Sequence, residues 1–400
     1  MGARAAIVWV VTLAAAFALG WWAGRPPTLD AKDMASSLER ALDEQDPLAR
    51  TRLMVRVFET LDAANVEEAM RIIDAEPRIE ESEIKLFMYV WTQIDPQRAF
   101  EAARRSKQNL IRDEGTAAAT YYWALDNPKA ALYWVETIED KARREYLTEY
   151  LITGWVLSGE RDSAAVYIAR LPRGVLKQLQ TSLILNEYLK EGPEAAIRWA
   201  ELLPDDVPRE YRHEVFQRVS KQVAARDPEL AARWITEHIG QEYARNTLRL
   251  IAAEWRERDP QAAFEWLVSL PDGRQRNRVL YNGFGGWFDD DPRAAQRWLE
   301  AETIRPAHDP ALDAFARRLS EKSPRQALHW AQMIEDPMRR EKSLTVVGQN
   351  WYRKNPEAAR AWLEESDLSA KAREAVLNPP PREAEAAENE SPETGPDPES

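Results

Sequence analysis

A short pattern recurs along most of this 400-residue chain and constrains its fold more than any other feature. It consists of Asp or Asn, then Pro, then Ala three residues past the Pro and Trp six residues past it. The Pro of this junction stands at Pro96, Pro128, Pro193, Pro228, Pro260, Pro292, Pro324 and Pro356, and the last five are each 32 residues apart. A fixed period of this size is typical of stacked helical-hairpin repeats.

Each part of the pattern has a physical reason. Asp or Asn before Pro predicts a helix N-cap followed by Pro at the first helical position, where no amide donor is lost. Ala at +3 and Trp at +6 lie on one helical face, so the Ala permits close approach and the Trp fills the core beside it. Most copies carry one or both of two tryptophans, six after or five before the Pro: Trp134, Trp199, Trp234, Trp266, Trp298, Trp330 and Trp362, and Trp91, Trp123, Trp255, Trp287 and Trp351. We therefore expect a short helix, a turn and a longer second helix in each repeat.

This architecture resembles the tetratricopeptide-like and related helical-hairpin solenoids over about residues 60–370. The shared features are the period, the Pro at the junction, the small Ala positions and the aromatic anchors. The chain departs from the tetratricopeptide pattern because its period is nearer 32 than about 34 residues and the Leu-Gly pair of the first helix is missing. The resemblance implies an all-α, right-handed α-solenoid of about ten repeats that binds proteins or peptides.

Four segments are predicted. Residues 1–25 form a signal-anchor, or transmembrane helix, because Ala5–Gly24 carries no charge and its 20 residues would span about 30 Å as a helix. A cleaved signal peptide is the alternative. Residues 26–60 are a linker and cap helix, or a degenerate first repeat; residues 61–375 are the solenoid; residues 376–400 are a disordered acidic tail. The expected localisation is a single-pass protein of the bacterial inner membrane with its repeat domain in the periplasm.

Composition excludes several functions. The net charge of −13 disfavours nucleic acid as a partner, because the summed field repels phosphate. The chain has no cysteine, and its four histidines lack the spacing of a zinc site. No nucleophile or phosphate-binding motif is present. We expect no metal, no cofactor and no enzymatic activity.

A column of cations is the first candidate binding surface. Sixteen residues before the junction Pro stand Arg112, Lys177, Arg212, Arg276 and Arg340. This register lies near the start of each second helix, where the helix dipole disfavours positive charge, so each cation needs a partner. Two hypotheses stay open: a salt-bridge ladder within the solenoid, or a basic stripe that receives acidic peptides or anionic glycans.

A glycine-rich stretch inside an expected helix is the second candidate. Asn282, Gly283 and Gly285 lie there, and each glycine costs a helix about 0.5–1 kcal/mol relative to Ala. Close helix approach or a kink is one explanation; a hinge or a groove where a ligand meets the backbone is the other.

Together these features predict a membrane-anchored extracytoplasmic scaffold. Its helical-repeat surface would bind protein or peptide partners, which we expect to be membrane or envelope proteins. One alternative is an accessory of an envelope enzyme, or an enzyme of glycan-processing type with its site on the solenoid. The other alternative is a purely structural spacer.

Overall fold

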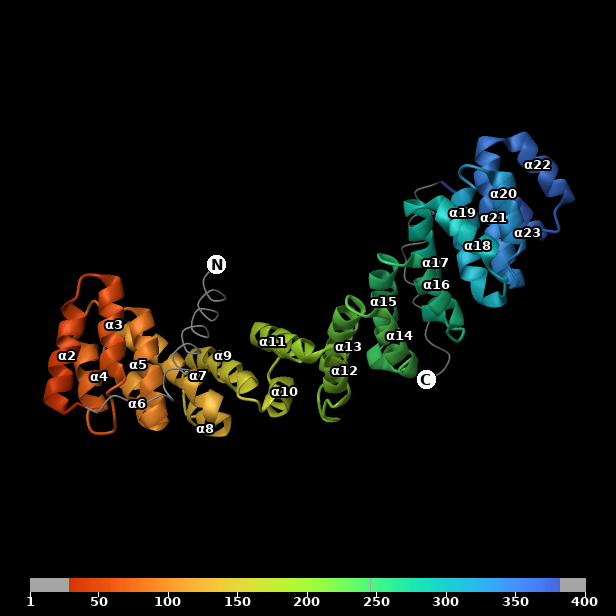
Figure 1. Ribbon diagram of the computed structural model, residues 1–400. Helices are drawn as coiled ribbons and strands as arrows, with labels where there is room; N and C mark the ends of the chain where they lie inside the picture. Colours follow the sequence, from red (N-terminus) through yellow and green to blue (C-terminus); the bar gives the residue numbers. More distant parts are fainter. Residues whose placement is uncertain (1–28, 245, 382–400) are drawn as a thin grey trace. The chain divides into compact units, whose positions relative to one another are not determined.

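A computed structural model describes residues 29–244 and 246–381 (Figure 1). This part of the chain contains 22 α-helices and no β-strand, which confirms the all-α fold class. The helices form two compact units: one takes the residues up to 195 with 201–207, and the other takes 196–200 with those from 208 onward. The right-handed solenoid of repeats stays a prediction.

The first unit contains ten α-helices in its described part. They are α2 (Ala31–Asp43), α3 (Pro47–Phe58), α4 (Val66–Ala75), α5 (Glu81–Ile94), α6 (Pro96–Arg105), α7 (Thr116–Asp126), α8 (Pro128–Glu136), α9 (Lys141–Leu157), α10 (Arg161–Arg170) and α11 (Val175–Glu191). A π-helical turn over Ile111–Gly115 leads into α7. Helix α12 (Pro193–Glu201) contributes residues to both units.

The second unit contains eleven more α-helices in its described part. They are α13 (Arg209–Ala224), α14 (Pro228–Glu237), α15 (Thr247–Arg256), α16 (Pro260–Ser269), α17 (Arg274–Asp290), α18 (Pro292–Ala301), α19 (Asp309–Leu319), α20 (Pro324–Gln332), α21 (Pro337–Lys354), α22 (Pro356–Glu365) and α23 (Ala370–Leu377). Two 3-10 turns, Glu242–Ala244 and Pro306–His308, precede α15 and α19.

Hydrogen bonds at the junction explain why one helix ends and the next begins within one to three residues. Asp259 is the N-cap of α16: its carboxylate accepts from the amide of Ala262 at 3.0 Å, and Pro260 follows at the start of the helix. The amide of Asp259 in turn donates to the carbonyl of Trp255 at 2.9 Å, in the last turn of α15. Asp95, Asn127, Asp291 and Asn355 make the equivalent pair of bonds at their own junctions.

The two tryptophans of a repeat pack against each other across the junction. The ring centroids lie 5.8 Å apart for Trp255 and Trp266, and 6.1 Å apart for Trp287 and Trp298. The junction Ala beside them is buried, as Ala263 and Ala295 show with no exposed surface. Burial of such large rings is a main source of stability in a core of short helices.

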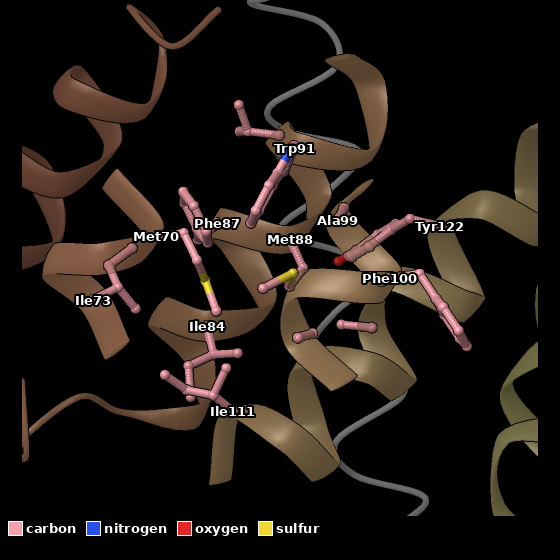
Figure 2. Close-up of a cluster of buried hydrophobic side chains, with 14 of the residues drawn as sticks. Met70, Ile73, Ile84, Phe87, Met88, Trp91, Ala99, Phe100, Ile111 and Tyr122 are labelled. Carbon is pink, nitrogen blue, oxygen red and sulfur yellow. The ribbon is translucent and has the colours of Figure 1, made fainter. Parts of the chain in front are cut away.

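Figure 2 shows the core at one stack of helices in the first unit. Phe87 and Trp91 of α5 lie with their ring centroids 5.5 Å apart, and Met70 of α4 and Phe100 of α6 belong to the same cluster. All four side chains are buried. The core is therefore continuous from one hairpin to the next, because no single hairpin could cover these residues.

The second helices of the hairpins pack against one another within each unit. In the first unit α3, α5, α7, α9 and α11 contact one another in that order, and in the second unit α13, α15, α17, α19, α21 and α23 do so. In Figure 1 these helices follow in chain order within each unit. The second helices therefore form one continuous row in each unit, and the first helices of the hairpins pack beside them.

Both ends of the described chain refine the sequence prediction. Residues 31–58, expected to include one cap helix or a degenerate repeat, form two contacting helices, α2 and α3. Most of the predicted tail 376–400 lies outside the described residues, but its first residue, Val376, is fully buried in α23. The other domain boundaries stay predictions.

The structure corrects the predicted localisation. Within residues 29–244 and 246–381, no helix is both long and apolar enough to cross a bilayer. The longest of these helices, α21, has 18 residues but carries Arg339, Arg340, Glu341 and Lys342 near its start, and charges of this kind are costly in hydrocarbon. The segment Ala5–Gly24, the expected anchor, lies outside the described residues. The prediction of a single-pass membrane protein is therefore wrong for the part of the chain that the structure describes.

Substitution of Gly154 should test the close packing of α9 on α7. A Cβ at this position would lie 2.9 Å from the Cβ of Ala124 and would also meet the carbonyl oxygen of Tyr121, which belongs to a helix backbone and cannot move aside. We expect Gly154→Ala to destabilise the protein by about 1–3 kcal/mol, measured by urea denaturation, although Ala favours helices.

Gly283→Ala is the matched control, because Gly283 also lies within a helix. A Cβ there would make ordinary contact with the ring of Phe264, at 3.4 and 3.5 Å. This variant should be neutral or stabilised by about 0.5–1 kcal/mol. Equal effects of the two substitutions would contradict the close approach of α7 and α9.

Candidate functional site: a groove on four second helices

A groove of about 860 Å³ opens on the face of the second unit that the second helices form. Its walls come from α17, α19, α21 and α23, together with Pro380, just past the last helix. Binding sites for small ligands and for peptide side chains commonly have volumes of this order. The groove is therefore the main candidate for a binding site in the described part of the chain.

Hydrogen bonds between helices hold the walls of the groove in place. The side-chain amide of Asn350 on α21 donates to the hydroxyl of Ser320, just past α19, at 2.8 Å. The side-chain amide of Gln349 donates to the carbonyl of Ala375 on α23 at 3.0 Å. A groove whose walls are tied in this way is preorganised, so little ordering entropy is lost when a ligand binds.

The carboxylate of Glu341 anchors one rim of the groove. Its Oε1 accepts from the backbone amide of Ser369, the N-cap of α23, at 2.9 Å. Hydrogen bonds from Ser369 hold the pKa of Glu341 below its usual value, so this carboxylate is negative at neutral pH. Glu341 therefore serves the packing of α23 on α21.

Four cationic side chains line the groove, and two of them already have acidic partners. Arg317 pairs with Asp313, Nε to Oδ1 at 2.6 Å, and its guanidinium lies 5.8 Å from the ring centroid of Tyr281. Arg318 pairs through Nε with both carboxylate oxygens of Asp289 at 3.1 Å. These two arginines are thus positioned by the fold and partly neutralised.

The other two cations, Lys342 and Lys371, are exposed side chains with no ion pair or hydrogen bond to the described residues. Near them Met338 at the start of α21 is 82% exposed, which is unusual for an apolar side chain of this size. The groove thus offers two uncompensated positive charges beside an apolar contact. Such a combination suits a ligand with carboxylates and an apolar group.

A second cavity, of about 530 Å³, lies at the turns of the same unit and contains Arg276. Several of its polar groups are already bonded to each other. Asp309 is buried, and its carboxylate accepts from the backbone amides of Glu335 at 2.9 Å and Asp336 at 2.8 Å. This cavity therefore holds the turns together and offers less to a ligand than the groove does.

Four of the five cations of the predicted basic column reach back to carbonyls at the end of the preceding helix. Lys177, only 5% exposed, donates from Nζ to the carbonyls of Ala169 at 2.6 Å and Leu171 at 3.0 Å. Arg276, also 5% exposed, donates from Nε to the carbonyl of Leu267 at 3.1 Å. The last carbonyls of a helix lack partners within it and carry its negative dipole end, so a cation is well placed there.

Arg112 and Arg340 make the same kind of bond at 3.3 Å to Ser106 O and at 2.8 Å to Ile334 O. Arg144, which the sequence places within two residues of the same register, bonds Ile138 O, and two further cations behave alike: Arg50 bonds Leu42 O and Arg373 bonds Leu368 O. The salt-bridge hypothesis explains only a small part of these contacts. Arg276 has one ion pair, 3.4 Å from Asp272, and its other hydrogen bonds go to backbone carbonyls and to Asn277. The fold therefore gives these cations intramolecular partners.

Arg212, the remaining member of the column, lies with its guanidinium 6.0 Å from the ring centroid of Tyr243. A guanidinium at this distance from an aromatic face gains a cation–π contact. The five predicted cations therefore occupy separate places along the chain, and only Arg276 lines one of the cavities described above.

The glycine-rich stretch belongs to α17, which runs without interruption from Arg274 to Asp290. Gly285 is buried, and a Cβ there would overlap the guanidinium of Arg318; a Cβ at Gly286 would overlap that of Arg256. The glycines make room for arginines from the neighbouring helices α19 and α15. Asn282 is exposed. The close-approach hypothesis explains this stretch, and Gly285 contributes to the groove by letting Arg318 lie flat on α17.

The groove residues Lys342, Lys371 and Met338 were not found from the sequence. The positions equivalent to Lys342 in four other repeats carry Glu114, Leu179, Glu214 and Arg278, so a cation does not recur there regularly. A search for residues that recur at the same position of each repeat cannot detect a binding site that is present in only one part of the chain.

Comparisons with known proteins add no functional information. No family model matches the chain, and no curated protein and no solved structure is significantly similar to it. The resemblance to tetratricopeptide-like solenoids therefore remains one of architecture.

Arg276→Met should reveal how much the basic column contributes to stability. The substitution removes the guanidinium donors to the carbonyl of Leu267 and to the half-buried carbonyl of Ala307, which costs about 1–3 kcal/mol. We expect a lower urea midpoint for this variant. Arg278→Met, which changes an exposed arginine of the same helix, should shift the free energy of unfolding by less than about 0.5 kcal/mol. An unchanged midpoint for Arg276→Met would contradict the capping role.

Proposed function

We propose that this chain is a helical-repeat scaffold without enzymatic activity, a right-handed α-solenoid of about ten repeats that binds a peptide segment of a partner protein. The binding site in this proposal is the groove on α17, α19, α21 and α23. The observation that carries the proposal is the pair Lys342 and Lys371, exposed beside Met338 in a groove of about 860 Å³.

The solenoid part of the proposal rests on the junctions and on helix packing. The junctions at Asp95, Asn127, Asp259, Asp291 and Asn355 repeat the same pair of hydrogen bonds. Each second helix contacts the next second helix of its unit. Repetition of one junction geometry favours regular stacking, and stacked hairpins commonly present an extended binding face.

The chemistry of the groove favours an acidic, partly apolar peptide. Two ammonium groups without partners attract carboxylates, and the charges of Glu321 and Glu341 on the same walls limit where those carboxylates can sit. Met338 and the ring of Tyr281 supply contact area for an apolar side chain. Methionine adapts its shape to different partners, which suits a site that binds peptides.

Selection of peptides tests the proposal directly. A random peptide library displayed on phage would be selected on the full-length protein, and the recovered peptides measured by fluorescence polarisation. We expect acidic residues next to an apolar residue. Binding should weaken by more than about tenfold in the double variant Lys342→Glu, Lys371→Glu, because like charges brought together cost several kcal/mol.

A double variant in the first unit serves as the matched control. Lys107→Glu, Lys129→Glu makes the same change of charge at two exposed lysines of the first unit. It should bind the selected peptides as the unchanged protein does. Equal loss in both variants, or recovery of no peptide that depends on Lys342 and Lys371, would refute the binding groove and favour a structural spacer.

A further inference from the structure

The chain leaves its last described helix at the edge of the groove. Pro380, three residues past the end of α23, is one of the groove's lining residues. The guanidinium of Arg353 on α21 donates to the carbonyl of Pro380 at 2.6 Å and also to Asn350 Oδ1 at 2.9 Å. Pro381, from which residues 382–400 continue, is therefore one residue past a point that is fixed at the groove.

The segment that continues from this point is negatively charged, and this charge is opposite to that of the two exposed lysines of the groove. Residues 382–400 contain a single cation, Arg382, and seven carboxylates: Glu383, Glu385, Glu388, Glu390, Glu393, Asp397 and Glu399. Lys342 and Lys371 are the exposed cations of the groove without partners among the described residues. Exposed charges attract one another mainly within a Debye length, about 8 Å at physiological ionic strength, so a segment that starts at the groove is favoured over a distant one.

The length of the segment is sufficient. Its 19 residues could extend over about 60 Å, at roughly 3.3 Å per residue. A tether of this length raises the effective concentration of its own carboxylates at the groove to the millimolar range. A ligand of weak intrinsic affinity would then occupy the site in a large share of the molecules.

We propose that residues 382–400 occupy this groove in the same molecule and compete there with peptides from a partner. This inference rests on the proposed function, since it takes the same groove as the binding site. The carboxylates of the segment pair with Lys342 and Lys371, and a partner peptide binds only when the segment has left. The segment thereby sets a threshold that a partner must exceed in affinity or concentration.

Zero-length cross-linking tests occupancy in the unaltered full-length protein. A carbodiimide joins a carboxylate to a lysine amine only when the two are in direct contact. Mass spectrometry of the monomer band should find residues 382–400 linked to Lys342 and Lys371 and not to Lys107 or Lys129. Links spread evenly over all four lysines would overturn the proposal, as would links found only in the dimer band.

Competition supplies the second measurement. In a full-length variant, Glu383, Glu385, Glu388, Glu390 and Glu393 are each changed to Gln, which removes five of the seven side-chain carboxylates of the segment without shortening the chain. A fluorescein-labelled synthetic peptide of residues 382–400 should bind this variant about tenfold more tightly than the unaltered protein, if the groove is open in about one molecule in ten. Adding Lys342→Glu and Lys371→Glu should abolish that binding; adding Lys107→Glu and Lys129→Glu should not.

The two proposals fail in different ways. If library-selected peptides bind through Lys342 and Lys371 but the 382–400 peptide does not bind, or binds both proteins equally, the occupancy by the chain's own segment is refuted and the proposed function stands. If no peptide of either kind depends on the two lysines, both proposals fail.

Discussion

Short helices leave many backbone groups without partners, and the way this chain satisfies them governs the rest of the structure. Each helix of about ten residues has four amides and four carbonyls that no intrahelical bond can reach. At the junctions, the Asp or Asn side chain takes one amide and the adjoining backbone amide takes a carbonyl of the preceding helix, as at Asp259. At the turns, cations such as Lys177 and Arg276 take the remaining carbonyls. With both ends bonded, consecutive hairpins can stack through their tryptophans and alanines.

This arrangement decides which charged groups are available to a partner. A cation in the register of Lys177, Arg276 and Arg373 is drawn onto the preceding helix end, where it is buried or half-buried and already bonded. Arginines further along, such as Arg317 and Arg318, pair with carboxylates of their own or the neighbouring second helix. Lys342 and Lys371 remain because they stand outside both sets of positions, on the rim of a groove whose walls are tied by Gln349 and Asn350.

Much of the fold could be predicted from the sequence, and little of the site. The all-α class follows from period and composition, and the helix starts at Pro128, Pro260 and Pro292 lie where the capping pattern places them. None of the residues that the sequence predicted to bind a partner lines the groove. Arg276 carries a strong periodic signal because its capping role repeats, whereas Lys371 carries none because its environment occurs once. The predicted membrane localisation was wrong for the described residues, because none of their helices is long and apolar enough to cross a bilayer. That prediction depended on Ala5–Gly24, which lies outside the described residues.

The sequence by itself determined the features that depend on neighbours along the chain: where helices begin and end, which face of each is buried, and which residues the repeat consumes. These are interactions between residues three to eleven apart, and a periodic pattern expresses them directly. Only the tertiary structure decided that Arg318 lies against Gly285, that the end of α23 meets Arg353, and that Lys342 and Lys371 line one groove. These relations join helices about thirty or more residues apart, and local patterning carries no information about side chains that meet only after the hairpins have stacked.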